Sequence, residues 1–114
     1  MKLELSPRLG AIAGLVPEGC GCLADIGTDH GYVPVSLLLE GRVRRAVAAD
    51  IGAPPLEHAR RTAARYGVTD RIDFRLGDGL SVLRPGEAEA IVIAGMGGDA
   101  IVDILSAAPW SRAG

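Results

Sequence analysis

Four short apolar segments alternate with amphipathic segments along this chain, and this alternation constrains its fold more than any other feature. Apolar runs of strand length lie at residues 21–26, 45–51, 71–79 and 89–95, and helical patterns lie at residues 6–16, 31–41, 53–67 and 97–108. Strands that alternate with helices in this way are typical of βαβ units and a parallel sheet. Because such crossovers are right-handed, the pattern predicts a doubly wound α/β fold with strand order 3-2-1-4 and flanking helices.

The length of the chain limits the size of this sheet. Its 114 residues suffice for one domain, which we expect to span residues 1–114. Four strands are only part of the usual doubly wound sheet of about six. We therefore expect the N-terminal portion of a longer domain, with an open sheet edge at the last strand or an edge that a partner covers.

Composition and cysteine spacing exclude several classes of protein. The chain is 48% hydrophobic and 23% charged, as in globular proteins. No apolar run approaches the ~20 residues that span a bilayer, and the N-terminus carries charges and Pro7 where a signal peptide is apolar. We therefore expect a cytoplasmic protein without a membrane anchor. Cys20 and Cys22 are too close for an unstrained disulfide and have no second pair for a zinc site, so we expect no metal.

The residues that end the predicted strands carry the chemistry of the chain. Asp25, Asp50 and Asp78 end the first three strands, and Gly95 ends the fourth. The carboxyl ends of parallel strands meet at one edge of the sheet, which is where ligands bind. The sequence therefore predicts three carboxylates at one binding edge.

The turn after the first strand distinguishes between two kinds of adenosine cofactor. It lacks the G-x-G-x-x-G fingerprint of dinucleotide sites, and Asp25 and Asp29 would repel a pyrophosphate. The same acids suit S-adenosylmethionine, which carries a sulfonium and an α-amino group. Asp50 would then accept hydrogen bonds from the ribose, and Asp78 from the adenine amine. These features favour S-adenosylmethionine over a nicotinamide cofactor.

The fourth predicted strand ends in a glycine-rich stretch opposite the first turn. Gly95, Gly97 and Gly98 open a floor for a substrate, although glycines are equally typical of a plain strand-to-helix turn. Met96 packs either against a flat base or into the core. The residues alone leave both alternatives open.

Several motifs, in this order and spacing, resemble one known family. The stretches LSPRL, ADIGTDHGYVPV, AADIGAPPLEHA, RLGDGL and IVIAGMGG followed by IVDIL are similar to those of the tRNA (adenine-22-N1)-methyltransferases. The resemblance implies a Rossmann-like class I methyltransferase that uses S-adenosylmethionine to methylate N1 of an adenine in the D-arm of bacterial tRNA. That family also carries further strands and a C-terminal helical domain that helps to grip tRNA, which these residues do not include.

The resemblance also implies the residues of the site. We expect cofactor contacts at Asp25, Gly27, Thr28, Gly31, Asp50, Ile51, Gly77, Asp78, Gly79, Ala94 and Gly95, and a substrate platform at Met96, Gly97 and Gly98. Adenine N1 attacks a methyl group with its own lone pair, so no strong base is needed, and a nearby carboxylate stabilises the cationic product. Asp29 is our choice for that role. His30 is either a relay or orienting donor, or a residue that only hydrogen-bonds the loop.

Arginines form two clusters, which are Arg42, Arg44 and Arg45, and Arg60, Arg61 and Arg65. The net charge of −2 argues against binding nucleic acid by bulk charge. If tRNA is the substrate, the second cluster supplies phosphate contacts, and otherwise it is a solvated helix face. His58 lies in the same predicted helix as the second cluster, and we expect it to have no catalytic role.

Three functions of different classes remain compatible with the sequence. The first is the tRNA adenine-N1 methyltransferase. The second is a fragment of a nicotinamide-dependent oxidoreductase, which the missing fingerprint and the acidic first turn disfavour. The third is a non-catalytic part of a methyltransferase that binds the cofactor or nothing, which the length of the chain favours.

Overall fold

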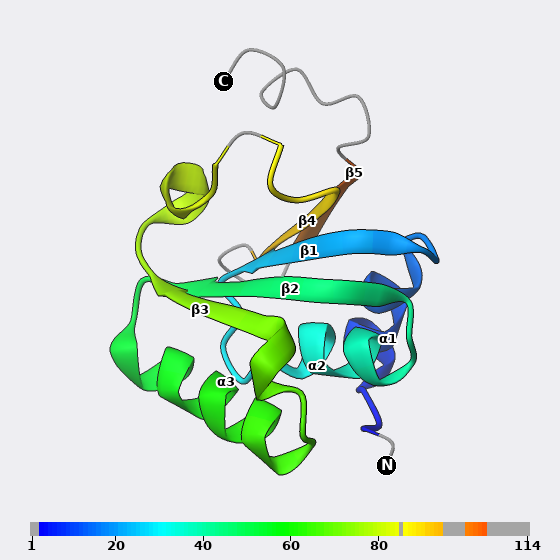
Figure 1. The fold of residues 1–114 in the computed structure, drawn as a ribbon, viewed down its shortest axis with the longest axis horizontal. Coiled ribbons are helices and arrows are strands. Elements are labelled where there is room, and N and C mark those ends of the chain that lie inside the picture. The colour runs from blue at the N-terminus through cyan, green and yellow to red at the C-terminus, as the bar shows by residue number, and fades with distance from the viewer. Residues whose placement is uncertain (1–2, 85, 95–99, 105–114) are drawn as a thin grey trace.

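The computed structural model describes residues 3–84, 86–94 and 100–104, which form a mixed sheet with helices on one face (Figure 1). The strands are β1 (Cys20–Ile26), β2 (Val43–Asp50), β3 (Ile72–Leu76), β4 (Ala90–Ala94) and β5 (Ala100–Ile104). The helices are α1 (Pro7–Gly14), α2 (Tyr32–Leu39) and α3 (Ala53–Arg65), with short 3₁₀ turns η1 (Thr69–Arg71) and η2 (Gly79–Val82). None of these helices has the length and apolar character needed to cross a bilayer.

The strand order within the described residues is β3-β2-β1-β4-β5, and the first four strands in space are parallel. The predicted α/β fold and the order 3-2-1-4 are therefore confirmed, although α1, α2 and α3 all cover one face of the sheet (Figure 1), whereas a doubly wound fold has helices on both faces. The register places Asp25 opposite Ala48 and Asp50 opposite Leu76. The carboxyl ends of β1, β2 and β3 consequently lie along one edge of the sheet.

The last strand differs from the sequence-based expectation of a helix over residues 97–108. Ala100–Ile104 forms β5, antiparallel to β4, with Ala94 opposite Ala100. Three of its five residues are β-branched, which favours a strand, and the outer edge of β4 offers unpaired backbone groups. The helix prediction is wrong for these residues, and so is the expected open edge, because β5 covers it. The rest of residues 97–108 lies outside the described residues.

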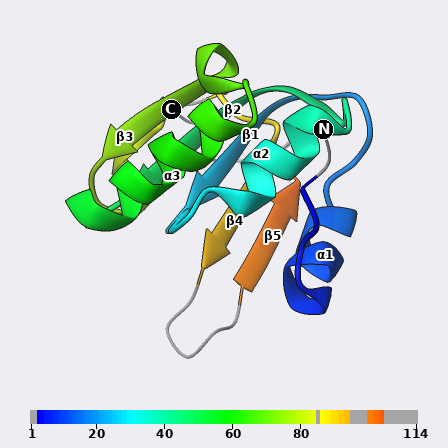
Figure 2. The same cartoon turned by 90° about the horizontal axis from the view of Figure 1, so that it is seen from below.

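The larger core lies between the sheet and the three helices (Figure 2). α2 is buried from Val33 to Leu38 because α1 and α3 flank it and β1 and β2 lie beneath it. α3 is amphipathic and buries Leu56, Ala59 and Ala63, which share one face at helical spacing. This packing places the start of α2 and the start of α3 at the same edge of the sheet as Asp25 and Asp50.

The turn after β1 packs directly on α3 at Gly31. Gly31 caps α2 with a φ of 73°, a conformation that side chains other than glycine rarely adopt. A Cβ at this position would lie 3.0 Å from the Ala59 Cβ and 3.1 Å from its Cα. Both the backbone angle and the close approach therefore require glycine here.

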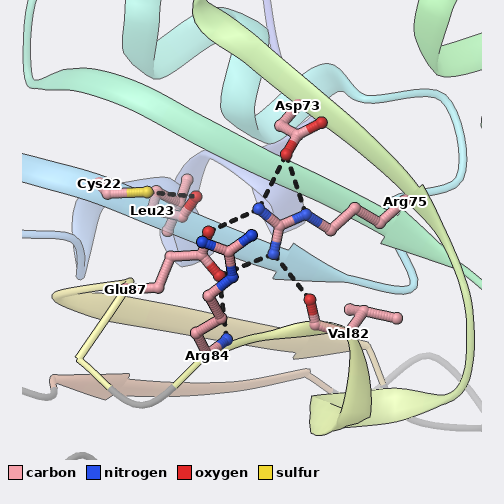
Figure 3. A network of polar contacts seen from close by, with 7 residues as sticks. All are labelled: Cys22, Leu23, Asp73, Arg75, Val82, Arg84 and Glu87. Atoms are coloured by element: carbon pink, nitrogen blue, oxygen red, sulfur yellow. Dashed lines mark hydrogen bonds and ion pairs between the residues drawn. The ribbon is translucent and has the colours of Figure 1, made fainter.

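The face of the sheet opposite the helices is covered by the segment between β3 and β4, in which Leu83 and Ala88 belong to a smaller apolar cluster. One arginine holds this segment in place. Arg75 on β3 donates two hydrogen bonds to Glu87, at 2.7 and 2.5 Å, and one to the Val82 carbonyl at 2.7 Å (Figure 3). The hydrogen-bonded Arg75 lowers the pKa of Glu87 to about 2. This network anchors residues 77–89, and with them the turn that begins at Gly77.

Replacing Gly31 with alanine tests the contact between the first turn and α3. We expect Gly31→Ala to lower the free energy of unfolding by on the order of 1–3 kcal/mol, because it adds backbone strain and a clash with Ala59. Urea titration followed by circular dichroism measures the change. Gly10→Ala is the matched control: it lies within α1 with open space around it, and we expect it to stabilise by about 0.5–1 kcal/mol. Equal effects of the two substitutions would contradict the account.

The Arg75–Glu87 pair predicts a loss of stability in acid. Because folding lowers the pKa of Glu87, its contribution is present above about pH 4.5 and is lost as the pH falls towards about 2. We expect a loss of about 1–3 kcal/mol over this range in the parent chain that Glu87→Gln does not show. Urea titrations at several pH values measure it, with the exposed Glu57→Gln as control. Parallel pH profiles of the parent chain and Glu87→Gln would refute the role of this pair.

Candidate functional site

Asp50, at the end of β2, joins three turns at the carboxyl edge of the sheet. Its Oδ2 accepts a hydrogen bond from the Asp29 N–H at 3.1 Å, and its Oδ1 accepts one from the Gly52 N–H at 3.0 Å. Its backbone carbonyl accepts the Gly77 N–H at 3.0 Å. The turns that follow β1, β2 and β3 are thus tied to one residue, as expected if they form one site.

The first turn is held by the backbone of β2. The Gly27 and Thr28 N–H groups both donate to the Ala49 carbonyl, at 2.8 and 2.9 Å. Asp29 has a φ of 56° and is the one non-glycine residue with positive φ in the described part of the chain. Aspartate tolerates this region better than most side chains, and strained conformations of this kind cluster at functional sites. The turn therefore presents Asp29 in a fixed conformation beside Asp50.

Asp25 is a buried acid beneath this turn. Its side chain is almost fully buried, and its Oδ2 accepts a hydrogen bond from the Thr28 hydroxyl at 2.9 Å. Burial raises the pKa of Asp25 to about 7; the Thr28 hydrogen bond opposes this rise, and the charge of Asp50 adds to it. A buried carboxyl group with one hydrogen-bond partner is well suited to pair with a cation that enters from outside.

A cavity of about 250 Å³ opens above Asp25, between the first turn and α1. Its lining includes five predicted site residues, which are Asp25, Gly27, Thr28, Asp29 and His30. It also includes residues that were not predicted, namely Arg8, Leu9, Ile12, Tyr32, Val33 and Val92. Arg8 adds a cation to a cavity that otherwise contains acids. Its signal in the sequence is the LSPRL stretch, which contributes to the family resemblance but was not assigned to the site.

The remaining predicted residues of β2 and β3 lie outside this cavity, farther along the sheet edge. Asp50 is linked to the cavity through the Asp29 N–H. Ile51 comes directly after β2, and Leu76 is the last residue of β3. The two residues are 75% and 60% exposed, respectively, although both are large and apolar. Asp78 is exposed, and its carbonyl accepts the Ser81 N–H at 3.2 Å. Leu76 was not predicted as a site residue.

The other predicted positions belong to the neighbouring turns and to β4. Gly31 caps the start of α2, Gly77 follows β3, and Gly79 begins η2. Ala94 ends β4. Gly95, Met96, Gly97 and Gly98 lie outside the described residues, so the predicted substrate platform is not described.

Three rings stack beside the mouth of the cavity. The His30 ring stacks on Tyr32, with centroids 5.1 Å apart, and on His58 of α3, with centroids 5.0 Å apart. His30 Nε2 lies 3.9 Å from Asp29 Oδ1. Sequence reasoning assigned no role to His58, because its contact with His30 joins two segments far apart in the chain. The stack gives the His30 ring a defined orientation next to Asp29.

Several solved structures and curated proteins that are similar to this chain are named as methyltransferases. A Bacillus subtilis (strain 168) tRNA (adenine(22)-N(1))-methyltransferase is 43% identical over 106 residues, which are 93% of this chain and 44% of that protein. The crystal structure of the B. subtilis M1A22 tRNA methyltransferase TrmK matches with a TM-score of 0.78 and 43% identity over 84% of this chain and 41% of the other. Streptococcus pneumoniae Sp1610 in complex with S-adenosyl-L-methionine matches with a TM-score of 0.76 and 33% identity, over 82% of this chain and 44% of the other. The chain spans less than half the length of these relatives.

The family model for a methyltransferase domain matches residues 5–113. This match covers nearly the whole sequence and agrees with the order of the parallel strands and with the site at their carboxyl ends. The chain therefore belongs to the methyltransferase-domain family.

Proposed function

We propose that the chain forms the S-adenosylmethionine-binding part of a tRNA adenine-N1 methyltransferase. The observation that carries the proposal is the cavity that the buried Asp25 and the cation of Arg8 line together, with Asp50 at its side. The relatives named as tRNA methyltransferases, one of the similar structures being a complex with S-adenosyl-L-methionine, support the same assignment. A tRNA substrate would place the protein in the cytoplasm.

The charges in the cavity match the methionine end of the cofactor. Asp25 and Asp29 supply negative charge for the α-amino group and the sulfonium, and Arg8 supplies a partner for the α-carboxylate. Leu9, Ile12 and Val92 provide apolar surface for the methylene groups between them. A pyrophosphate would instead face two carboxylates, which disfavours a nicotinamide dinucleotide.

The edge beyond Asp50 matches the adenosine end. Each Asp50 carboxylate oxygen already accepts one backbone N–H and retains a lone pair for a ribose hydroxyl. The exposed side chains of Ile51 and Leu76 offer apolar surface to the faces of a purine. Asp78 is the acid that would accept a hydrogen bond from the exocyclic amine.

In the proposed reaction the protein aligns groups and stabilises charge. S-adenosylmethionine, when bound, supplies an electrophilic methyl group. The target adenine contributes the N1 lone pair that forms the new bond, so the chain need not remove a proton first. Asp29, 69% exposed at the cavity mouth, would stabilise the positive charge that develops on the ring. His30, fixed by Tyr32 and His58, would orient Asp29 or the base.

Calorimetric titration with S-adenosylmethionine tests the cofactor assignment, with NAD as the comparison ligand. We expect saturable binding of S-adenosylmethionine alone. We expect Asp50→Ala to weaken it at least about tenfold, because ribose hydrogen bonds and the anchor of the first turn are both lost. Asp70→Ala, an exposed acid in η1, serves as the matched control and should bind like the parent chain. Binding of NAD, or equal affinities of the two variants, would overturn the assignment.

The raised pKa of Asp25 predicts a pH dependence of cofactor binding. Only the carboxylate pairs with a cation, so affinity should rise between about pH 6 and about pH 7.5. Binding should also release a proton, which calorimetry in buffers of different ionisation enthalpy detects. Asp25→Asn should bind more weakly and without this pH dependence. An unchanged pH profile in that variant would rule out Asp25 as the titrating group.

The chain without ligand should show the opposite trend in stability. Folding raises the pKa of Asp25, so its protonated form is favoured in the folded state, and stability falls as the pH rises from about 4 to about 7. Asp25→Asn should remove this decline. Urea titrations across that range measure it, and a decline of the same size in both chains would show that other groups cause it.

A further inference from the structure

A second cavity adjoins the candidate cofactor cavity. It has a volume of about 310 Å³ and is lined by Leu3, Glu4, Tyr32, Thr62, Arg65 and Tyr66. Tyr32 lines both cavities, so the two spaces adjoin at this residue. The proposed cofactor site uses none of the other residues of the second cavity. Two tyrosines and an arginine around one space are a set of groups that recognises a nucleotide, because rings stack on bases and guanidinium groups bind phosphates.

The Tyr32 ring, which belongs to both cavities, is held in place by its stack on His30. Tyr32 is 38% exposed, and its inner contact is the His30 ring, which in turn stacks on His58. Because two segments of the chain that are far apart in sequence supply these rings, the tyrosine is supported on one side while part of it faces solvent. A base that stacks on Tyr32 would extend an existing column of rings.

The charge on α3 complements an RNA backbone. The helix carries Arg60, Arg61 and Arg65 against the single acid Glu57, in a chain whose net charge is −2. Glu57 lies 4.0 Å from Arg60 and 3.9 Å from Arg61 at exposed positions, and such surface pairs contribute little. The Arg65 guanidinium lies 5.8 Å from the centre of the Tyr66 ring, within the second cavity. Of the three arginines, Arg65 therefore lies beside the two tyrosines, whereas the Arg60 guanidinium lies 4.9 Å from the centre of the Phe74 ring.

The first arginine cluster is used differently. Arg42 donates hydrogen bonds to the carbonyls of Gly14 and Val16, so it closes the end of α1. Arg44 lies near the start of β2, at the end of the strand remote from Asp50. The arginine that lines the second cavity together with its two tyrosines is Arg65 of α3.

We propose that the second cavity is a subsite for a nucleotide of single-stranded RNA next to the methylated base. Its base stacks on Tyr32, with Tyr66 as the second ring, and its phosphate contacts Arg65. Glu4, the one acid in the cavity, would repel a phosphate and is placed to accept a hydrogen bond from a base amino group. This inference rests on the proposed function, since a nucleotide here lies beside the base only if the first cavity holds the methyl donor.

Binding of a short single-stranded RNA that contains 2-aminopurine tests the subsite in the absence of cofactor. Anisotropy of an end-label measures affinity, and quenching of 2-aminopurine measures stacking. We expect Tyr32→Ala to weaken binding by about five- to a hundredfold and to abolish the quenching, while Tyr32→Phe retains both. We expect Arg65→Gln to reduce the slope of log affinity against log salt by about 0.7, as for one lost phosphate contact on a single strand. Arg44→Gln removes the same charge elsewhere and should leave the slope unchanged.

The outcomes separate the subsite from the proposed function. Titration of the parent chain with S-adenosylmethionine is read independently: its failure counts against the methyltransferase assignment and the placement of the subsite beside the methylated base, whereas the RNA measurements test nucleotide binding at the second cavity by themselves. Equal quenching in Tyr32→Ala and Tyr32→Phe, equal salt slopes in Arg65→Gln and Arg44→Gln, or equal affinity for a duplex RNA with its bases paired would each overturn the subsite. Absence of RNA binding by a folded parent chain would do the same. Thermal unfolding of each variant checks that the fold is retained.

Discussion

The hydrogen bonds around Asp50 are the interaction on which the rest of the site depends. One carboxylate accepts N–H groups from the first turn and from the loop before α3, and the carbonyl of the same residue accepts the N–H of Gly77. Three loops that are far apart in sequence are thereby fixed at one edge of the sheet. Charge-assisted hydrogen bonds to backbone groups are among the stronger polar contacts in proteins, so this arrangement is firm before any ligand enters. A preformed edge of this kind lowers the cost of binding.

The two faces of the sheet support that edge in different ways. On the helical face, apolar packing and the contact of Gly31 with Ala59 set the position of the first turn. On the other face, where the apolar cluster is smaller, the Arg75–Glu87 pair holds residues 77–89 against β3. Burial and a hydrogen-bonded ion pair thus fix opposite sides of the same site.

The parts of this structure that could be predicted from the sequence are those governed by local pattern. Apolar runs, glycines and strand-end acids locate β1 to β4 and the turns at Asp25, Asp50 and Asp78, because periodicity and turn chemistry act over a few residues. Arg8 and His58 were not predicted as members of the site region, since each reaches it only through packing of a distant helix. Residues 100–104 were wrongly predicted to be helical because their local preference for helix or strand is mixed. Their pairing with the free edge of β4, which local pattern does not show, decides that they form β5.

The central claim is that the turns joined by Asp50 form the cofactor site, and amide NMR spectra recorded during titration with S-adenosylmethionine test it most directly. The account predicts saturable shifts that are largest for the amides of Gly27, Asp29, Gly52 and Gly77, all of which donate to Asp50 or to its neighbour Ala49. Amides around Glu87 and Ala88, on the other face, should move little. Absence of saturable shifts in a folded chain, or shifts concentrated around Glu87 and Ala88, would contradict the claim.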